Sequence, residues 1–226
     1  MAILDPRLDF APWRLSGTVI GPLLNDPAAL SALGDTVNAP PYKAPPRAPV
    51  LYVKPRNTLV GSGAEIAAPA DGGEYELGAT LGLIIGRTAC RVAAADALQH
   101  VAGLAIVVDL SVPHASFYRP SVRFKARDGS CIVGAGRARG ALDPDAVLLR
   151  VSVDGRPAHE APMAGLQRPA ARLIEDVSAF MTLHPGDLLL LGVRHGAPRV
   201  RGGQRFAVAG EGFASVEAAL VTGGAA

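Results

Sequence analysis

Four short runs of apolar residues constrain the fold of this chain more than any other feature of its sequence. They occupy residues 50–53, 81–85, 104–108 and 188–193. Each run has the length of a β-strand, and its nearly unbroken apolar character is typical of strands that are buried on both faces. We therefore predict a mainly β (α+β) fold that is built from short strands and has few helices.

A hairpin and two helices are predicted between these strands. Residues 149–153 alternate between apolar and polar side chains before Asp154-Gly155, a pattern that favours a β-hairpin. Residues 94–101 and 169–181 favour helices, the second because apolar residues recur there at helical spacing, at Leu173, Val177 and Phe180. The sequence contains no internal repeat.

The chain of 226 residues is long enough to bury one core. We predict one domain at residues 49–226, preceded at residues 1–48 by an amino-terminal extension or lid segment. Within the extension, Asp26-Pro27 can cap and begin a short helix that Gly34 can end. The prolines of residues 39–49 favour an extended connection to the domain.

Charge and composition argue against several classes of protein. The net charge of +2 gives no reason to expect a nucleic-acid partner. Residues 1–9 carry two acids and no sustained apolar segment, so we do not expect a secretory signal, and no run approaches the roughly 20 apolar residues that cross a membrane. Two cysteines are too few for a disulfide scaffold, which favours a reduced, cytoplasmic setting.

Residues 78–86, taken together with Val107-Val108-Asp109, resemble the core strands of the fumarylacetoacetate hydrolase family. Other segments match that family in the same order, so the resemblance runs from about residue 48 to residue 221. These segments are residues 54–61, 101–103, 123–131 and 181–187. The resemblance implies a fumarylacetoacetate-hydrolase-like β-sandwich or roll around one pocket, with a few short helices.

The resemblance also bears on metal binding. In the family, the strand equivalent to residues 78–86 begins with Glu-x-Glu, and a later strand supplies an Asp. Residues i and i+2 of a strand project to one face about 6 to 7 Å apart, so these carboxylates can share one Mg²⁺ or Mn²⁺. Here Gly78 and Thr80 replace the two glutamates, and Asp109 is the candidate metal ligand that remains. The resemblance therefore implies Mg²⁺ or Mn²⁺ for the family and weak or absent metal binding for this chain.

A rival pair of carboxylates, Glu74 and Glu76, keeps the i, i+2 spacing four residues earlier. Such a displacement would move the pair by about 13 Å along the strand, and the match at residues 81–86 fixes the register against it. We therefore predict that Glu74 and Glu76 lie at the solvated beginning of the strand.

Lys125 matches a lysine that the family places in its pocket, and we predict a catalytic role for it. Arg123, Lys125 and Arg127 alternate, which predicts a strand with one cationic face that either binds substrate carboxylates or is solvated. His114 follows Asp109 by five residues and is predicted as a catalytic acid or base, because the ordinary pKa of histidine lies near neutrality. A loop histidine without a catalytic role is the alternative.

The predicted substrate-binding residues are Tyr118, Arg119, Arg123 and His195. His195 follows Leu191-Gly192-Val193-Arg194, where family members carry a Thr-Gly-Thr-Pro loop at the pocket. The family's His/Glu pair for proton transfer has no counterpart in the lid region, because no histidine precedes His100. Cys131 is predicted to lie in the core.

Residues 41–46, 111–114 and 117–120 resemble one branch of the family, the amino-terminal half or first subunit of a bifunctional isomerase/decarboxylase of 4-hydroxyphenylacetate (homoprotocatechuate) catabolism. The resemblance implies action on small oxo-polycarboxylates, namely 5-oxopent-3-ene-1,2,5-tricarboxylate and 2-hydroxyhepta-2,4-diene-1,7-dioate. It leaves two hypotheses open. The chain is either a catalytic subunit with a degenerate metal site, or a non-catalytic partner that stabilises or completes a homologous subunit in a homodimer or heteromer. An acylpyruvate hydrolase or oxaloacetate decarboxylase would need the Glu pair and a lid histidine, which are lacking.

Overall fold

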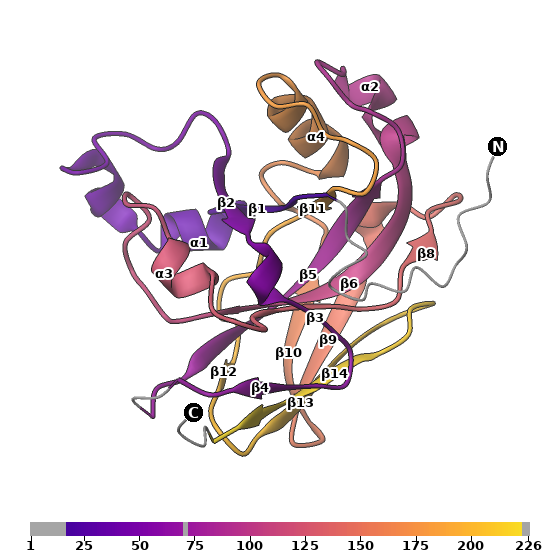
Figure 1. Ribbon diagram of the computed structural model, residues 1–226. Helices are drawn as coiled ribbons and strands as arrows, with labels where there is room; N and C mark the ends of the chain where they lie inside the picture. The colour runs from indigo at the N-terminus through magenta and orange to yellow at the C-terminus, as the bar shows by residue number, and fades with distance from the viewer. Residues whose placement is uncertain (1–16, 70–71, 223–226) are drawn as a thin grey trace.

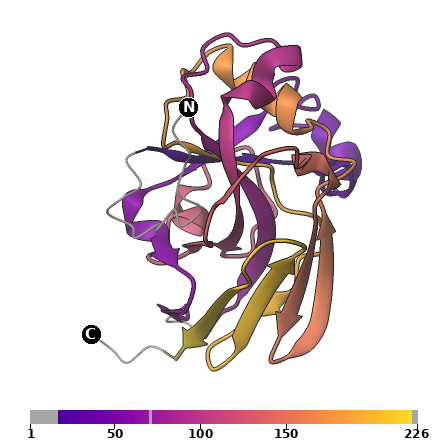
Figure 2. The ribbon, with the colours of Figure 1, turned by 90° about the vertical axis from the view of Figure 1, so that its right-hand side faces the viewer.

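The computed structural model describes residues 17–69 and 72–222, and their strands form two curled mixed sheets (Figures 1 and 2). The larger sheet runs in the order β2-β1-β11-β5-β6-β7-β3, with β12 paired to β5 and β8 paired to β6. Its strands are β1 Val19–Leu23, β2 Val50–Lys54, β3 Leu59–Gly61, β5 Tyr75–Ile85, β6 Val101–Ser111, β7 Cys131–Val133, β8 Arg137–Ala138, β11 Leu188–Leu190 and β12 Arg199–Val200.

The smaller sheet runs in the order β10-β9-β13-β14-β4 and lies at the bottom of Figure 1. Its strands are β4 Ala64–Ala67, β9 Leu148–Val153, β10 Arg156–Pro162, β13 Arg205–Gly210 and β14 Val216–Val221. Apolar side chains from both sheets, among them Leu81 and Val208, belong to one buried cluster, so the main core joins the two sheets.

The helices are short. They are α1 Pro27–Ser31, α2 Ala94–Ala97, α3 Val122–Lys125 and α4 Ala170–Ser178, with 3₁₀ turns η1 Gly34–Asn38, η2 Arg56–Thr58, η3 Leu98–His100 and η4 Pro144–Ala146. The longest of them, α4, buries Leu173, Ile174 and Val177 in the main core, as its amphipathic pattern requires. Its first amide, that of Ala170, donates to the Asp145 carboxylate at 3.0 Å. No helix of the described residues is long and apolar enough to span a membrane.

The two long central strands, β5 and β6, carry large apolar side chains on one face and smaller or polar residues on the other. One face sends Leu77, Leu81 and Leu83 of β5 and Leu104, Ile106 and Val108 of β6 into the main core. Because side chains alternate along a strand, the opposite face carries Gly78 and Thr80 of β5 and Asp109 of β6. Gly78 pairs directly with Asp109 in the ladder, so the small residues of β5 leave room beside this carboxylate.

The four predicted apolar strands and the hairpin are confirmed, although residues 191–193 extend beyond β11. At the hairpin turn, Asp154 and Gly155 have φ values of 49° and 75°, the left-handed conformation that such a turn needs. The predicted helix at 94–101 is shorter, because Val101 already begins β6. Phe180 follows the end of α4 and is 66% exposed, so its predicted place on the buried stripe is wrong.

The prediction of a strand through Arg123, Lys125 and Arg127 is wrong, because the first two lie in α3. Side chains two positions apart on a helix point in nearly opposite directions, at about 200°. Lys125 is accordingly buried, whereas Arg123 and Arg127 are exposed. A single cation, and not a row of three, enters the interior from this segment.

The sheet reaches into the segment that the sequence assigns to the amino-terminal extension. β1 pairs with β2 in antiparallel and with β11 in parallel orientation. As predicted, Asp26 caps α1, its carboxylate accepting the Ala28 amide at 3.1 Å, and Pro27 lies in the first turn. The position of the domain boundary near residue 48 stays a prediction.

Candidate functional site

A cavity of about 490 Å³ opens where α1, the ends of β5 and β6, the segment after β6 and the loop after β11 meet. Its apolar wall includes Leu24, Leu33 and Phe117. The ionisable side chains that line it are Tyr52, Glu76, His114, Lys125, Arg194, His195 and Arg199. Cationic groups therefore predominate over carboxylates in the wall of the cavity.

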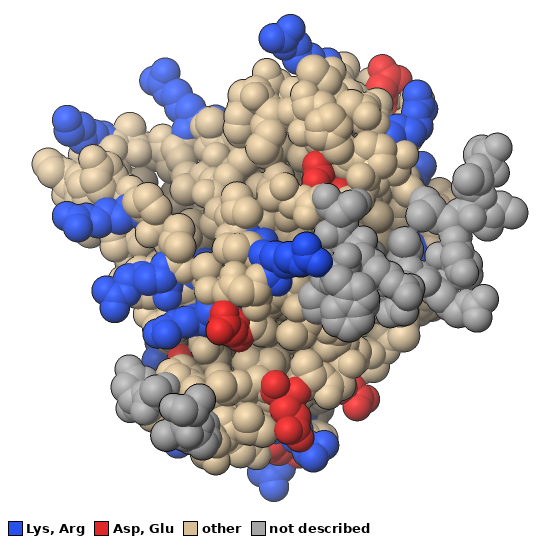
Figure 3. Space-filling view, in the orientation of Figure 1, with Lys and Arg blue, Asp and Glu red and all other residues tan. Residues whose placement is uncertain are grey.

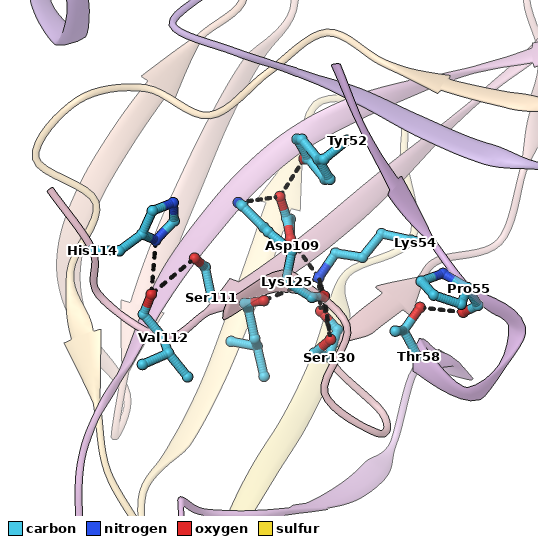
Figure 4. Close-up of polar contacts among 11 residues, drawn as sticks. Tyr52, Lys54, Pro55, Thr58, Asp109, Ser111, Val112, His114, Lys125 and Ser130 are labelled. Atoms are coloured by element: carbon cyan, nitrogen blue, oxygen red, sulfur yellow. Dashed lines mark hydrogen bonds and ion pairs between the residues drawn. The ribbon is translucent and has the colours of Figure 1, made fainter. Parts of the chain in front are cut away.

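Asp109 lies behind this wall and is the centre of a buried polar cluster (Figure 4). Lys54 Nζ lies 2.7 Å from its Oδ1, and Lys125 Nζ lies 2.7 Å from its Oδ2. The hydroxyl of Tyr52 donates to the same Oδ2. Oδ2 thus accepts two hydrogen bonds, whereas Oδ1 is ion-paired with Lys54 but makes no hydrogen bond with the described residues.

The two lysines differ in how fully they are paired. Lys54 Nζ also lies within hydrogen-bond distance of the carbonyls of Leu110 (3.0 Å), Lys125 (2.7 Å) and Ser130 (3.0 Å), more acceptors than its three hydrogens can serve. Lys125 Nζ has one acceptor within the described part of the chain, Asp109, and lies 4.7 Å from the centre of the Tyr52 ring. Lys54 is therefore structural, whereas Lys125 faces the cavity with hydrogens to spare.

The charge state of the cluster follows from its surroundings. Burial alone would raise the pKa of Asp109, but the ammonium groups of Lys125 and Lys54 and their hydrogen bonds lower it to about 2. Burial and the neighbouring Asp109 carboxylate raise the pKa of Tyr52 well above its ordinary value. Near neutral pH, Asp109 is therefore a carboxylate and Tyr52 is a neutral hydrogen-bond donor.

His114 lines this cavity and has one buried nitrogen without a hydrogen-bond partner among the described residues. Its Nδ1 lies 3.0 Å from the carbonyl of Val112, and because a carbonyl can only accept, this contact places a proton on Nδ1. In the neutral ring Nε2 is then an acceptor, and this buried atom has no hydrogen-bond partner among the described residues. The ring stacks on Phe124 with centroids 4.6 Å apart, which fixes its orientation. An imidazole in this tautomer can act as a base towards a ligand that reaches Nε2.

Asp26 holds the part of the cavity wall that contains Arg194 and His195. Its Oδ2 accepts the His195 amide at 2.6 Å, and its Oδ1 lies 3.4 Å from Arg194 Nη1. Since Oδ1 also accepts the amide of Ala28, this carboxylate is largely occupied by backbone groups. Arg194 Nη1 is buried and makes no hydrogen bond with the described residues. One acid thus ties the start of α1 to the loop that carries Arg194.

The residues present do not fit the divalent metal ion that the Glu-x-Glu pattern would hold. A side chain at Gly78 would begin 2.5 Å from Val193 Cγ2, so Val193 fills the space of the first missing ligand. The hydroxyl of Thr80 accepts the Gly192 amide at 3.1 Å and is already used. Asp109, the third position, is held by two ammonium groups. No three His, Cys, Asp or Glu side chains of residues 17–69 and 72–222 converge on a common point.

The structure brings together Asp109, Lys125, His114 and His195 of the predicted site residues, either in the cavity wall or directly behind it. Tyr118, Arg119 and Arg123 are exposed and lie outside this wall, so their role in binding stays a prediction. Glu76 is half-buried at the second position of β5 and lines the cavity, so its predicted place at the beginning of the strand is confirmed. Its neighbour Glu74 lies at the surface near Arg199 and Arg201 (3.9 and 4.0 Å).

Sequence reasoning missed Tyr52 and Lys54. The signal lay in β2, where Tyr52 and Lys54 share one face of the strand while Val53 faces the other way. Tyr52 and Lys54 are buried and Val53 is 51% exposed, the reverse of the order that hydropathy predicts. Cys131 is buried, as predicted.

Comparisons with known proteins agree with this geometry. The family described as fumarylacetoacetate (FAA) hydrolase, C-terminal, matches residues 18–221. The 4-hydroxyphenylacetate degradation bifunctional isomerase/decarboxylase of Escherichia coli is 40% identical over 207 residues, which cover 92% of this chain and 48% of that protein. The chain therefore spans about half the length of these curated relatives.

Two solved structures have the same fold. The 5-carboxymethyl-2-hydroxymuconate delta-isomerase from Mycobacterium smegmatis superposes with a TM-score of 0.78 at 28% identity, covering 92% of this chain and 78% of that one. Fumarylpyruvate hydrolase from Pseudomonas aeruginosa, in complex with Mn²⁺ and pyruvate, gives a TM-score of 0.75 at 23% identity, covering 91% and 89%. The predicted mainly β fold is confirmed.

Proposed function

This chain belongs to the fumarylacetoacetate hydrolase family, and from this premise we propose that it is one subunit of an isomerase/decarboxylase acting on small oxo-polycarboxylates in 4-hydroxyphenylacetate catabolism. In this proposal the metal-dependent chemistry belongs to a homologous subunit that carries Glu-x-Glu. The observation that carries the proposal is the state of Asp109, which two lysines of this chain already neutralise.

Two further features support a paired arrangement. The relatives that share about 40% identity are twice as long as the matched region, so a second domain of comparable size accompanies their equivalent of this chain. The fold is nevertheless complete around its cavity, with a continuous core through both sheets. A subunit that had lost all contact with substrate would have no need to keep an ordered cavity lined by Lys125 and His114.

The residues of this chain can bind and orient an acidic ligand. Lys125 can donate to a carboxylate or to a developing oxyanion, because it has hydrogens left after its ion pair with Asp109. Tyr52 and Lys54 keep the Asp109 carboxylate in place and thereby fix Lys125. These roles require no metal ion.

Reconstitution tests the proposal. The purified chain is assayed for isomerisation of 2-hydroxyhepta-2,4-diene-1,7-dioate and for release of CO₂ from 5-oxopent-3-ene-1,2,5-tricarboxylate. Each assay is run with Mg²⁺, alone and with the homologous Glu-x-Glu subunit, and light scattering measures complex formation. We expect a complex whose activity exceeds the sum of its parts. Full Mg²⁺-dependent turnover by this chain alone, or no complex and no enhancement, would refute the proposal.

A second candidate function rests on His114. Its unpaired Nε2 could take a proton from one carbon of the diene-dioate and return it to another, a net-neutral isomerisation, while Lys125 stabilises the enolate oxygen. In that case the chain alone isomerises the diene-dioate in EDTA, and His114→Asn abolishes this activity. Because the Asn amide can replace the Nδ1 donor to Val112 but is not a base, a loss of activity with unchanged folding separates this function from the first.

A further inference from the structure

We propose that the cavity of this chain binds a small organic dicarboxylate directly on Lys125 and Arg194, without a divalent cation. The choice of an organic acid rests on the proposed function. The metal-independent mode of binding, and Arg194 as one of its two anchors, rest on the contacts of this chain.

The first anchor is Lys125, which belongs to a buried cluster with a net positive charge. Lys54 and Lys125 share one carboxylate, so this buried cluster carries one more positive than negative charge. A buried charge without a counter-charge is unfavourable, and an anion that enters the cavity offsets it. Since Lys54 is enclosed by protein oxygens and Lys125 lines the cavity, the anion contacts Lys125.

The second anchor is Arg194. Its side chain is 20% exposed, and Nη1 is buried with no hydrogen-bond partner among the described residues. Nη1 faces Asp26 Oδ1 at 3.4 Å and holds the guanidinium in the wall, so a ligand reaches Arg194 through the exposed fifth of its side chain. A planar guanidinium with free N–H groups is suited to a carboxylate.

The two anchors come from different parts of the fold and face one space. Lys125 ends α3, whereas Arg194 lies in the loop after β11, and both line the same cavity of about 490 Å³. A cavity of this size accommodates a small molecule. A ligand with a carboxylate at each end and an apolar middle matches a cavity that is lined both by these cations and by apolar side chains, which include Leu24 and Leu33.

The surface near the cavity favours the approach of anions. On the left of Figure 3, the side that carries α1 and α3 in Figure 1, Lys and Arg predominate over Asp and Glu. Arg123 of α3 is exposed, as are Arg119 and Arg127, which flank that helix in the chain. Clustered cations raise the local concentration of an anionic ligand and speed its association.

The metal ion is excluded by Val193, next to Arg194. Val193 fills the volume in front of Gly78, where the family's first glutamate would project. The same loop thus closes the metal position and presents a guanidinium to the cavity. In this chain, the positive charge that anchors an acid comes from the protein.

Calorimetry with inert dicarboxylates tests the inference. Succinate, glutarate, adipate and pimelate are titrated into the full chain in EDTA, with 1,6-hexanediol as the uncharged control. We expect one member of the series to bind best, no binding of the diol, and no change in affinity when Mn²⁺ replaces EDTA. Arg194→Gln and Lys125→Met should each weaken binding by about tenfold or more, the usual effect of losing one charge-assisted hydrogen bond. Arg194→Lys keeps the charge and should retain part of the affinity.

Arg201→Gln is the matched control, because Arg201 is 71% exposed and lies outside the cavity wall. Its affinity should stay within about twofold of the parent chain, since surface charges contribute little. Thermal melting of each variant separates lost binding from lost folding. The inference is overturned if no dicarboxylate binds, if binding requires Mn²⁺, or if Arg201→Gln weakens binding as much as Arg194→Gln. Because turnover and complex formation are not measured, such a failure leaves the proposed function to its own test.

Discussion

The buried ion-pair cluster makes a sharp prediction for Asp109→Asn. The substitution keeps the shape of the side chain but removes the counter-charge of Lys54 and Lys125, each 2.7 Å away. Two ammonium groups would then face each other in the interior with no carboxylate between them. Removing one partner of a buried pair typically destabilises by about 3 to 5 kcal/mol, because it leaves an uncompensated charge. We expect a loss in this range at pH 7.

The lowered pKa of Asp109 adds a dependence on pH. Its value of about 2 lies below the ordinary 3.8, a difference of just under two units. At about 1.4 kcal/mol per unit, this difference is worth about 2 kcal/mol of stability. Since the folded-state pKa is the lower one, the contribution is present above pH 3.8 and is lost as the pH falls towards 2. The Asp109→Asn variant should lack this loss.

Urea unfolding followed by circular dichroism between pH 7 and pH 2 measures both quantities. Asp35→Asn is the matched control, because it removes an exposed carboxylate from η1 and should change the free energy of unfolding by less than about 0.5 kcal/mol. Other acids also titrate in this range, so the decisive quantity is the difference between variant and parent. If Asp109→Asn lowers the free energy of unfolding by less than about 1 kcal/mol at pH 7, and leaves its decrease below pH 3.8 unchanged, Asp109 is not held as described.

Three further predictions concern the surroundings of the cluster. Gly78→Ala should destabilise the chain by about 1 to 3 kcal/mol by overpacking against Val193, and the double variant with Val193→Ala should recover part of this in a double-mutant cycle of urea unfolding. Tyr52→Phe removes the hydroxyl that donates to Asp109 and keeps the ring, so the free energy of unfolding should fall by about 1 to 2 kcal/mol. An unchanged free energy of unfolding would show that this hydrogen bond does not stabilise the cluster. Asp26→Ala removes the cap of α1 and the acceptor of the His195 amide, so amide hydrogen exchange should accelerate at Ala28 and His195 together, whereas acceleration at only one of them would contradict a shared tether.

Strand positions could be predicted from sequence because burial on both faces demands an unbroken apolar run, and residues 81–85 and 104–108 show such runs. The segment around Lys125 could not. Alternating charges fit a strand face, yet residues 122–125 form one helical turn, and the contact of Lys125 with Asp109 is a tertiary interaction that local preferences do not encode. The role of Lys54 could not be predicted for a similar reason, because burying a lysine is favourable only where the fold has already placed its hydrogen-bond acceptors.

The sequence by itself determined the family, the central strands and the loss of two carboxylates at Gly78 and Thr80, because strand periodicity and side-chain chemistry are local properties. Only the tertiary structure decided what replaced them. Val193 reaches Gly78 from a loop more than a hundred residues away, and Lys54 and Lys125 meet Asp109 from separate elements. Such contacts depend on the three-dimensional approach of distant segments, and they place two ammonium groups beside the one carboxylate of this sheet face, at a distance where their charges interact strongly.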